Sequence, residues 1–142
     1  MITENYVSFE TAKLLKEKGF EGHSILTIYD ENAANAYIKE LKEKHLPFSS
    51  DDPKLKEFHY AQPTLQTAMK WLREDKKILI SIFCHIDKGY WFCIQHLINS
   101  PYKFATSESI HRKEEILGKI HYYDTYETAC EEAILYCLKN LI

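Results

Sequence analysis

The segment 78–98 (ILISIFCHIDKGYWFCIQHLI) constrains the fold of this chain most, because it predicts a β-hairpin. Two runs rich in β-branched and aromatic residues flank Asp87, Lys88 and Gly89, which suit a three-residue loop closed by a glycine in the left-handed conformation. The cross-strand pairs expected from this loop are Ile86–Tyr90, Cys84–Phe92, Ile82–Ile94 and Ile80–His96. The sheet is therefore predicted to be at least partly antiparallel.

The two faces of this hairpin differ in chemistry, because side chains alternate between the faces along a strand. The even-numbered face is almost wholly apolar, and burying each Ile or Phe on it contributes about 1.5–3 kcal/mol, so this face is predicted to be core. On the odd-numbered face we expect His85 opposite Trp91 and Phe83 opposite Cys93. The candidate binding residues on the odd-numbered face are Phe83, His85, Trp91, Cys93 and Gln95.

Composition indicates an ordinary soluble protein of one domain spanning residues 1–142. Hydrophobic residues make up 45% of the chain and charged residues 27%, with a net charge of -3. The charges are mixed along the sequence, which argues against a protein that mainly grips phosphates. No apolar run approaches the roughly 20 residues of a membrane span, and the first residues do not resemble a signal peptide. The expected location is the cytoplasm, with no membrane association.

The four cysteines are predicted to be reduced and buried, where they act as small hydrophobic residues. Cys84 and Cys93 fall on opposite hairpin faces, which does not suit a disulfide. Cys130 and Cys137 lie two helical turns apart, roughly 10 Å along the axis. Pairings between the hairpin and the last helix stay open. Cys84 is placed in the core and Cys93 on the candidate surface.

The rest of the chain predicts several helices and two further strands. Helical periodicity and capping residues place helices at 9–18, 32–44, 65–75 and 125–142, the last of them capped by Asp124 with Glu127 three residues on. Strands are expected at 24–29 and 119–123, a short helix at 109–117, and irregular structure at 46–60. The fold class is therefore α+β: a two-layer domain with a partly antiparallel sheet of about three to four strands and helices packed on one face.

Three segments, YVSFETAKLLKEKGF, PTLQTAMKWLRE and YYDTYETACEEAILYCLKNLI, resemble a family of small uncharacterised proteins from gut anaerobic bacteria. Members of this family are often associated with prophages or other mobile elements. The resemblance covers about a third of the chain, mostly helix caps and apolar helix stripes. It implies a prophage-type context and supplies no activity, cofactor or catalytic residue.

Catalytic and metal-binding patterns are weak. The four glycines are not spaced to cradle a phosphate, and the seven histidines are scattered without an HxxxH or CxxC pair, so we expect no cofactor and no metal. A Cys–His nucleophile formed by Cys93 and His85 is conceivable, but the expected register offsets the two groups. The paired carboxylates at 114–115 and 131–132 are predicted to be surface charges.

A nucleic-acid-binding role rests on one short stretch. Lys70, Arg73 and Lys77 recur at helical spacing beside Trp71, and cations next to an aromatic ring can contact a nucleic-acid backbone. Acidic residues at 74–75 interrupt this patch, and the whole chain is acidic. This role is therefore the weaker alternative.

The sequence favours a non-catalytic interaction protein, an accessory factor that uses the odd-numbered hairpin face to contact a protein partner or a second copy of itself. Tyr and Trp combine apolar area with a polar tip, which suits such contacts. A nucleic-acid accessory factor is the alternative. A small thiol-dependent enzyme centred on Cys93 comes third.

Overall fold

The computed structural model describes residues 5–22, 26–96, 103–106 and 121–142, and within them the chain is an α+β protein. A three-stranded antiparallel sheet has the strand order β3-β4-β5. Two further strands, β1 and β2, form a separate antiparallel ribbon. In chain order the elements are α1 (Phe9–Glu17), β1 (Thr27–Tyr29), α2 (Glu31–Glu43), the 3₁₀ helix η1 (Pro53–Phe58), β2 (His59–Ala61), α3 (Leu65–Asp75), β3 (Ile78–His85), β4 (Gly89–His96), β5 (Lys103–Thr106) and α5 (Tyr126–Asn140).

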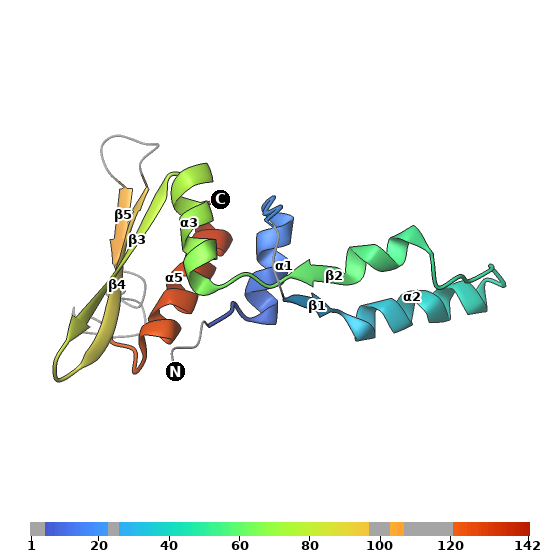
Figure 1. Cartoon of the computed structure of the whole chain (residues 1–142), viewed down its shortest axis with the longest axis horizontal. Helices are drawn as coiled ribbons and strands as arrows, with labels where there is room; N and C mark the ends of the chain where they lie inside the picture. The colour runs from blue at the N-terminus through green and yellow to red at the C-terminus, as the bar shows by residue number, and fades with distance from the viewer. Residues whose placement is uncertain (1–4, 23–25, 97–102, 107–120) are drawn as a thin grey trace.

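The α+β prediction with helices packed on one sheet face is confirmed. Helices α3 and α5 pack against β3 and β4, and α1 packs on α5. Figure 1 shows α3 and α5 between the sheet and α1. The side chains that meet these helices come from the even-numbered face of the hairpin, as expected: Ile78, Ile80, Phe92 and Ile94 are all buried.

The register of the hairpin differs from the expected one by two residues. Cys84 pairs with Tyr90 rather than Phe92, and Phe83 pairs with Trp91 rather than Cys93. The turn begins earlier than predicted, because the backbone N–H of Lys88 donates to the carbonyl oxygen of His85 at 3.2 Å. A shift by an even number of residues keeps every side chain on its predicted face, so the division into two faces stands.

Gly89 has the expected left-handed backbone, with φ of +107°, but it begins β4 instead of closing the loop. A second constraint acts on this residue, since a Cβ here would meet the carbonyl oxygen of Tyr123. Tyr123 approaches so closely because it forms two backbone hydrogen bonds with Tyr90, at 2.8 and 2.7 Å. The strand expected at 119–123 is present among the described residues only as this bridge.

Local sequence signals set the helix ends. Ser8 and Thr64 accept hydrogen bonds from backbone N–H groups three residues on, so they cap α1 and α3 as predicted. The cap of α5 lies one residue later than predicted: Thr125, not Asp124, accepts from the N–H of Thr128.

The sequence pattern does not predict β5, because the pairing of this strand with β4 depends on tertiary contacts. The short helix expected at 109–117 lies outside the described residues.

Residues 26–62 form an arm that projects from the rest of the molecule (Figure 1). The ribbon of β1 and β2 forms its base, and α2 packs against η1 beyond it. Ala34 is the only buried residue of α2, so this helix contributes little core. The segment 46–60, predicted to be irregular, contains η1 and β2, although 46–50 has no regular structure.

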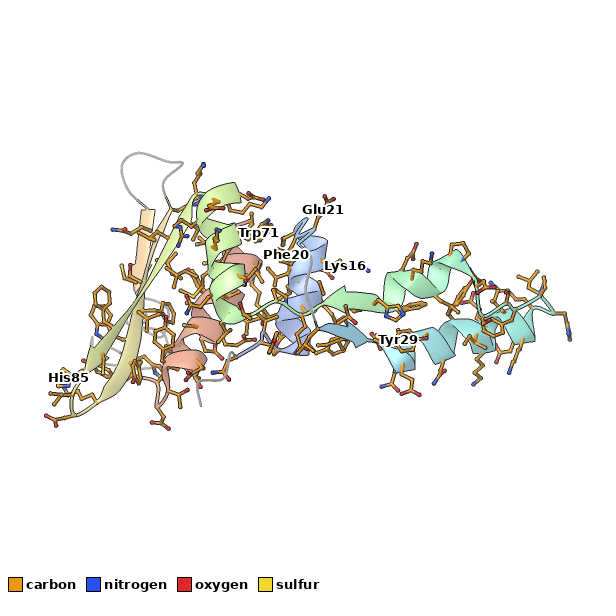
Figure 2. The ribbon with its side chains drawn as sticks, viewed as in Figure 1. Lys16, Phe20, Glu21, Tyr29, Trp71 and His85 are labelled. Atoms are coloured by element: carbon orange, nitrogen blue, oxygen red, sulfur yellow. The ribbon has the colours of Figure 1, made fainter. Side chains whose placement is uncertain are left out.

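The arm is held to α1 at its base. Lys16 Nζ donates to the carbonyl oxygens of Glu57 and His59, at 2.7 and 3.1 Å, and lies 4.7 Å from the ring centroid of Tyr60. Lys13 adds an ion pair with Asp30 at 3.6 Å. Figure 2 labels Lys16 where α1 meets the arm. These contacts fix the direction in which the arm leaves α1.

Candidate functional site

The five candidate binding residues lie on one face of the hairpin formed by β3 and β4. We call this face the hairpin surface, and its residues are Phe83, His85, Trp91, Cys93 and Gln95. Phe83, His85 and Gln95 are exposed, whereas Trp91 and Cys93 are half-buried. Phe83 exposes 44% of its surface. Figure 2 shows His85 at the outer end of the hairpin, on the side of the molecule opposite the arm.

Phe83 and Trp91 form the centre of the hairpin surface. The observed register places them directly opposite one another, and their rings stack with centroids 4.5 Å apart and planes 22° apart. Such a pair contributes about 0.5–1.5 kcal/mol beyond its buried area, which fixes the orientation of both rings. The pair therefore presents a rigid aromatic platform on the outer face of the sheet.

His85 lies at the edge of this platform, and not opposite Trp91 where the expected register places it. Its ring packs edge-on against Tyr122 with centroids 5.9 Å apart, and its Nδ1 accepts from the backbone N–H of Asp87 at 3.3 Å. Lys88 Nζ lies 5.6 Å from the Tyr122 centroid. Tyr122 thus extends the aromatic area of the hairpin surface, a contact that the sequence pattern did not reveal.

The structure does not assemble a thiol nucleophile at Cys93. Cys93 pairs with Ser81, which precedes His85 by four residues on β3. At about 3.3 Å per strand residue, the thiol and the imidazole are roughly 13 Å apart along the sheet. Burial also raises the pKa of the Cys93 thiol, which keeps it protonated and poorly nucleophilic. Both observations oppose the thiol-enzyme hypothesis.

All four cysteines are free thiols, as predicted, and Cys130 and Cys137 are buried in α5. The prediction that Cys84 belongs to the core is wrong, because Cys84 is exposed. It lies on the apolar even-numbered face, but the helices cover only the first half of β3: Ile78 and Ile80 are buried, and exposure then rises toward the turn. Ile86, expected on the same core face, is 94% exposed in the turn.

The residues proposed for nucleic-acid contact do not share one helix face. Lys70 and Arg73 are exposed on α3. Lys77 follows the end of the helix with a φ of +58°, and its Nζ donates to the carbonyl oxygen of Glu74. Trp71 packs edge-on against Phe20 with centroids 5.5 Å apart, and Lys76 Nζ lies 5.3 Å from its ring (Figure 2). Trp71 is therefore engaged in packing.

Two surface features were not expected from the sequence. A hollow of about 310 Å³ lies between the start of α1 and α5, and Glu127, Glu131 and Glu132 give it an acidic lining. Within it, Glu131 Oε1 already accepts hydrogen bonds from the backbone N–H of Ser8 and the hydroxyl of Thr11. The far end of the arm exposes Leu46 and Phe48, by 51% and 42%. No periodic pattern marked either feature.

The described part of the chain shows neither a cluster of metal-binding side chains nor a membrane-spanning helix. No group of three or more His, Cys, Asp or Glu side chains there is placed to hold a metal ion. None of the helices described has the length and apolar character needed to cross a membrane.

Comparisons with protein-family models, with curated proteins and with solved structures find no match to this chain. The resemblance to prophage-associated proteins of gut anaerobes therefore stays a prediction from three sequence segments. The arguments about function rest on the geometry of the hairpin.

Proposed function

We propose that this chain is a non-catalytic binding protein that contacts a protein partner through the hairpin surface. The observation that carries this proposal is the stacked Phe83–Trp91 pair near the hairpin end, in which Phe83 is exposed and Trp91 is half-buried. Aromatic side chains are enriched at protein interfaces, and anchors of this kind dominate binding energy.

The chemistry around the pair supports a protein contact better than a phosphate contact. Asp87 and Lys88 at the turn offset one another, so the described residues place no basic patch at the hairpin end. His85 and Tyr122 add polar atoms at the rim of the aromatic platform. An apolar centre with a polar rim is the usual arrangement of a protein–protein interface.

A matched pair of substitutions tests the proposal. Phe83 on the hairpin surface and Phe48 at the end of the arm are almost equally exposed, by 44% and 42%. We expect Phe83→Ser to reduce self-association in sedimentation velocity and partner capture from a cell extract by about tenfold or more, since a hot-spot anchor contributes about 2 kcal/mol or more. Phe48→Ser should leave both unchanged, and circular dichroism should show both variants folded.

Two results would overturn the proposal. If Phe83→Ser mainly unfolds the protein, the hairpin surface is part of the core. If Phe83→Ser and Phe48→Ser behave alike in both binding assays, the stacked pair is not the contact site.

A further inference from the structure

We propose that the hairpin surface is continued by an open strand edge on β3, and that two copies of this chain join through it in an antiparallel pairing centred on Cys84. This inference rests on the proposed function in one respect: both place the contact at the hairpin end. The proposed function uses an aromatic face, whereas this inference uses backbone groups along one edge. The two can therefore fail separately.

The edge follows from the strand order. β4 is paired on both sides, by β3 along its whole length and by β5 and Tyr123 on its other side. β3 is the first strand of the sheet, and no strand in the described part of the chain pairs with its other edge. Every second residue of an edge strand presents its backbone N–H and C=O groups outward, where they match another strand.

β3 lacks the features that usually protect an edge. Native proteins blunt exposed edges with charged side chains, prolines or bulges. The eight residues of β3, ILISIFCH, contain no Asp, Glu, Lys, Arg or Pro, and the strand pairs with β4 in unbroken register. An edge without charges can meet its own copy without like-charge repulsion, which is the electrostatic requirement for self-pairing.

The burial of β3 defines which part of the edge is open. Ile78 and Ile80 lie under the helices, whereas Phe83, Cys84 and His85 are exposed. Figure 1 shows the turn of the hairpin as the outermost part of the sheet at the end away from β5. A second copy can therefore align along the last residues of β3 without its helices meeting those of the first.

A second copy fits this edge better than an arbitrary extended peptide, because the edge is self-complementary. Dimers with two-fold symmetry bury the same patch on both subunits, and a strand paired with itself across such an axis runs antiparallel. An axis at Cys84, the middle of the exposed residues 83–85, places Phe83 opposite His85 of the second copy, on the same face. That pairing covers part of the Phe83 side chain, which is 44% exposed in the single chain. The remaining pair is Cys84 with Cys84.

Cys84 supplies a direct probe of this register. It is the only one of the four free cysteines that is exposed, and directly opposed residues of antiparallel strands have Cα atoms about 4.5–5.5 Å apart, within disulfide range. Diamide, which takes up the two electrons and two protons released by two thiols, should convert the full chain into a covalent dimer on a non-reducing gel. Cys84→Ser should abolish this dimer.

Two further cysteine placements test the register itself. In the Cys84→Ser background, a mixture of Phe83→Cys and His85→Cys chains should form a heterodimer under diamide, and Phe83→Cys alone should give about tenfold less product. Equal cross-linking by all pairs would show random collision of a mobile tip, and would overturn the proposal.

Sedimentation equilibrium in reducing buffer tests the dimer without any cross-link. Cys84→Lys places two ammonium groups opposite one another at the axis, so the dimer dissociation constant should rise at least about tenfold relative to Cys84→Ser.

A chain that stays monomeric at every concentration, including one that binds an extended peptide along β3 as a monomer, would overturn this inference. If Phe83→Ser still reduced partner capture in that case, the proposed function would stand. Conversely, a Cys84-centred dimer combined with identical capture by Phe83→Ser and Phe48→Ser would support this inference and overturn the proposed function.

Discussion

The hydroxyl of Thr11 donates a hydrogen bond to Glu131 Oε1, joining α1 to α5 across 120 residues of sequence. Thr11 is fully buried, and the same carboxylate oxygen accepts from the backbone N–H of Ser8 at 3.0 Å. One carboxylate therefore satisfies the buried hydroxyl and a backbone donor at the start of α1. This contact fixes how α1 docks on the helix layer.

Replacing Thr11 by Val should lower the free energy of unfolding by about 1–2 kcal/mol, because it removes a hydrogen bond to a charged group while keeping the side-chain shape. Urea denaturation measures this loss. A double-mutant cycle with Glu131→Ala separates the Thr11–Glu131 pair from the Ser8 contact. A coupling energy near zero would show that the two side chains do not interact in solution.

Gly89→Ala should destabilise the protein more than Gly19→Ala, although both glycines have positive φ, of +107° and +92°. At Gly19 no atom lies within 4 Å of an added Cβ, so the cost is the backbone strain alone, about 1 kcal/mol. At Gly89 the Cβ would also displace Tyr123 and its backbone bonds to Tyr90. Thermal denaturation of both variants checks this order; equal losses would mean that the Tyr90–Tyr123 bridge is not formed.

Lys16→Met should loosen the arm and leave the helix layer unchanged. The substitution removes the two hydrogen bonds from Nζ to the carbonyl oxygens of Glu57 and His59. We expect amide hydrogen exchange in residues 26–62 to rise by about fivefold, equivalent to about 1 kcal/mol, with little change in α3 and α5. Lys18→Met is the matched control, because Lys18 Nζ contacts the carbonyl oxygen of Ile142 instead. A uniform rise across the chain in Lys16→Met would contradict this prediction.

Alkaline pH should destabilise the protein through the buried thiol of Cys137. Burial raises the pKa of this thiol from 9.0 to about 12. The unfolded thiol ionises near pH 9 while the folded thiol stays protonated, so the free energy of unfolding falls as the pH rises from about 9 toward 12. Burial also raises the pKa of the Cys130 thiol to about 11, so this thiol adds to the loss of stability at alkaline pH.

The contribution of Cys137 appears as a difference between two chains. Urea denaturation at a series of pH values should show a shallower alkaline decline for Cys137→Ala than for the unchanged protein, even though Cys137→Ala is less stable at pH 7. Cys84→Ala is the control and should keep the original slope, since Cys84 is exposed. Parallel slopes for Cys137→Ala and the unchanged chain would contradict the prediction.

The sequence alone determined the features that depend on neighbouring residues. Helical periodicity and capping side chains located α1 and α3 almost to the residue, because Ser8 and Thr64 bond to backbone groups only three residues away. Alternation along the strands also separated the buried face of the hairpin from the hairpin surface. That division survived the two-residue error in register, because strand periodicity is two.

Tertiary structure alone decided the features that depend on residues far apart in the chain. Tyr123 bonds to Tyr90, and this contact accompanies a register that brings Phe83 against Trp91. The helices end before the hairpin does, which leaves Cys84 in solvent although its own face is apolar. Periodicity records which way a side chain points, but only the length and position of the packed helices determine whether anything covers it.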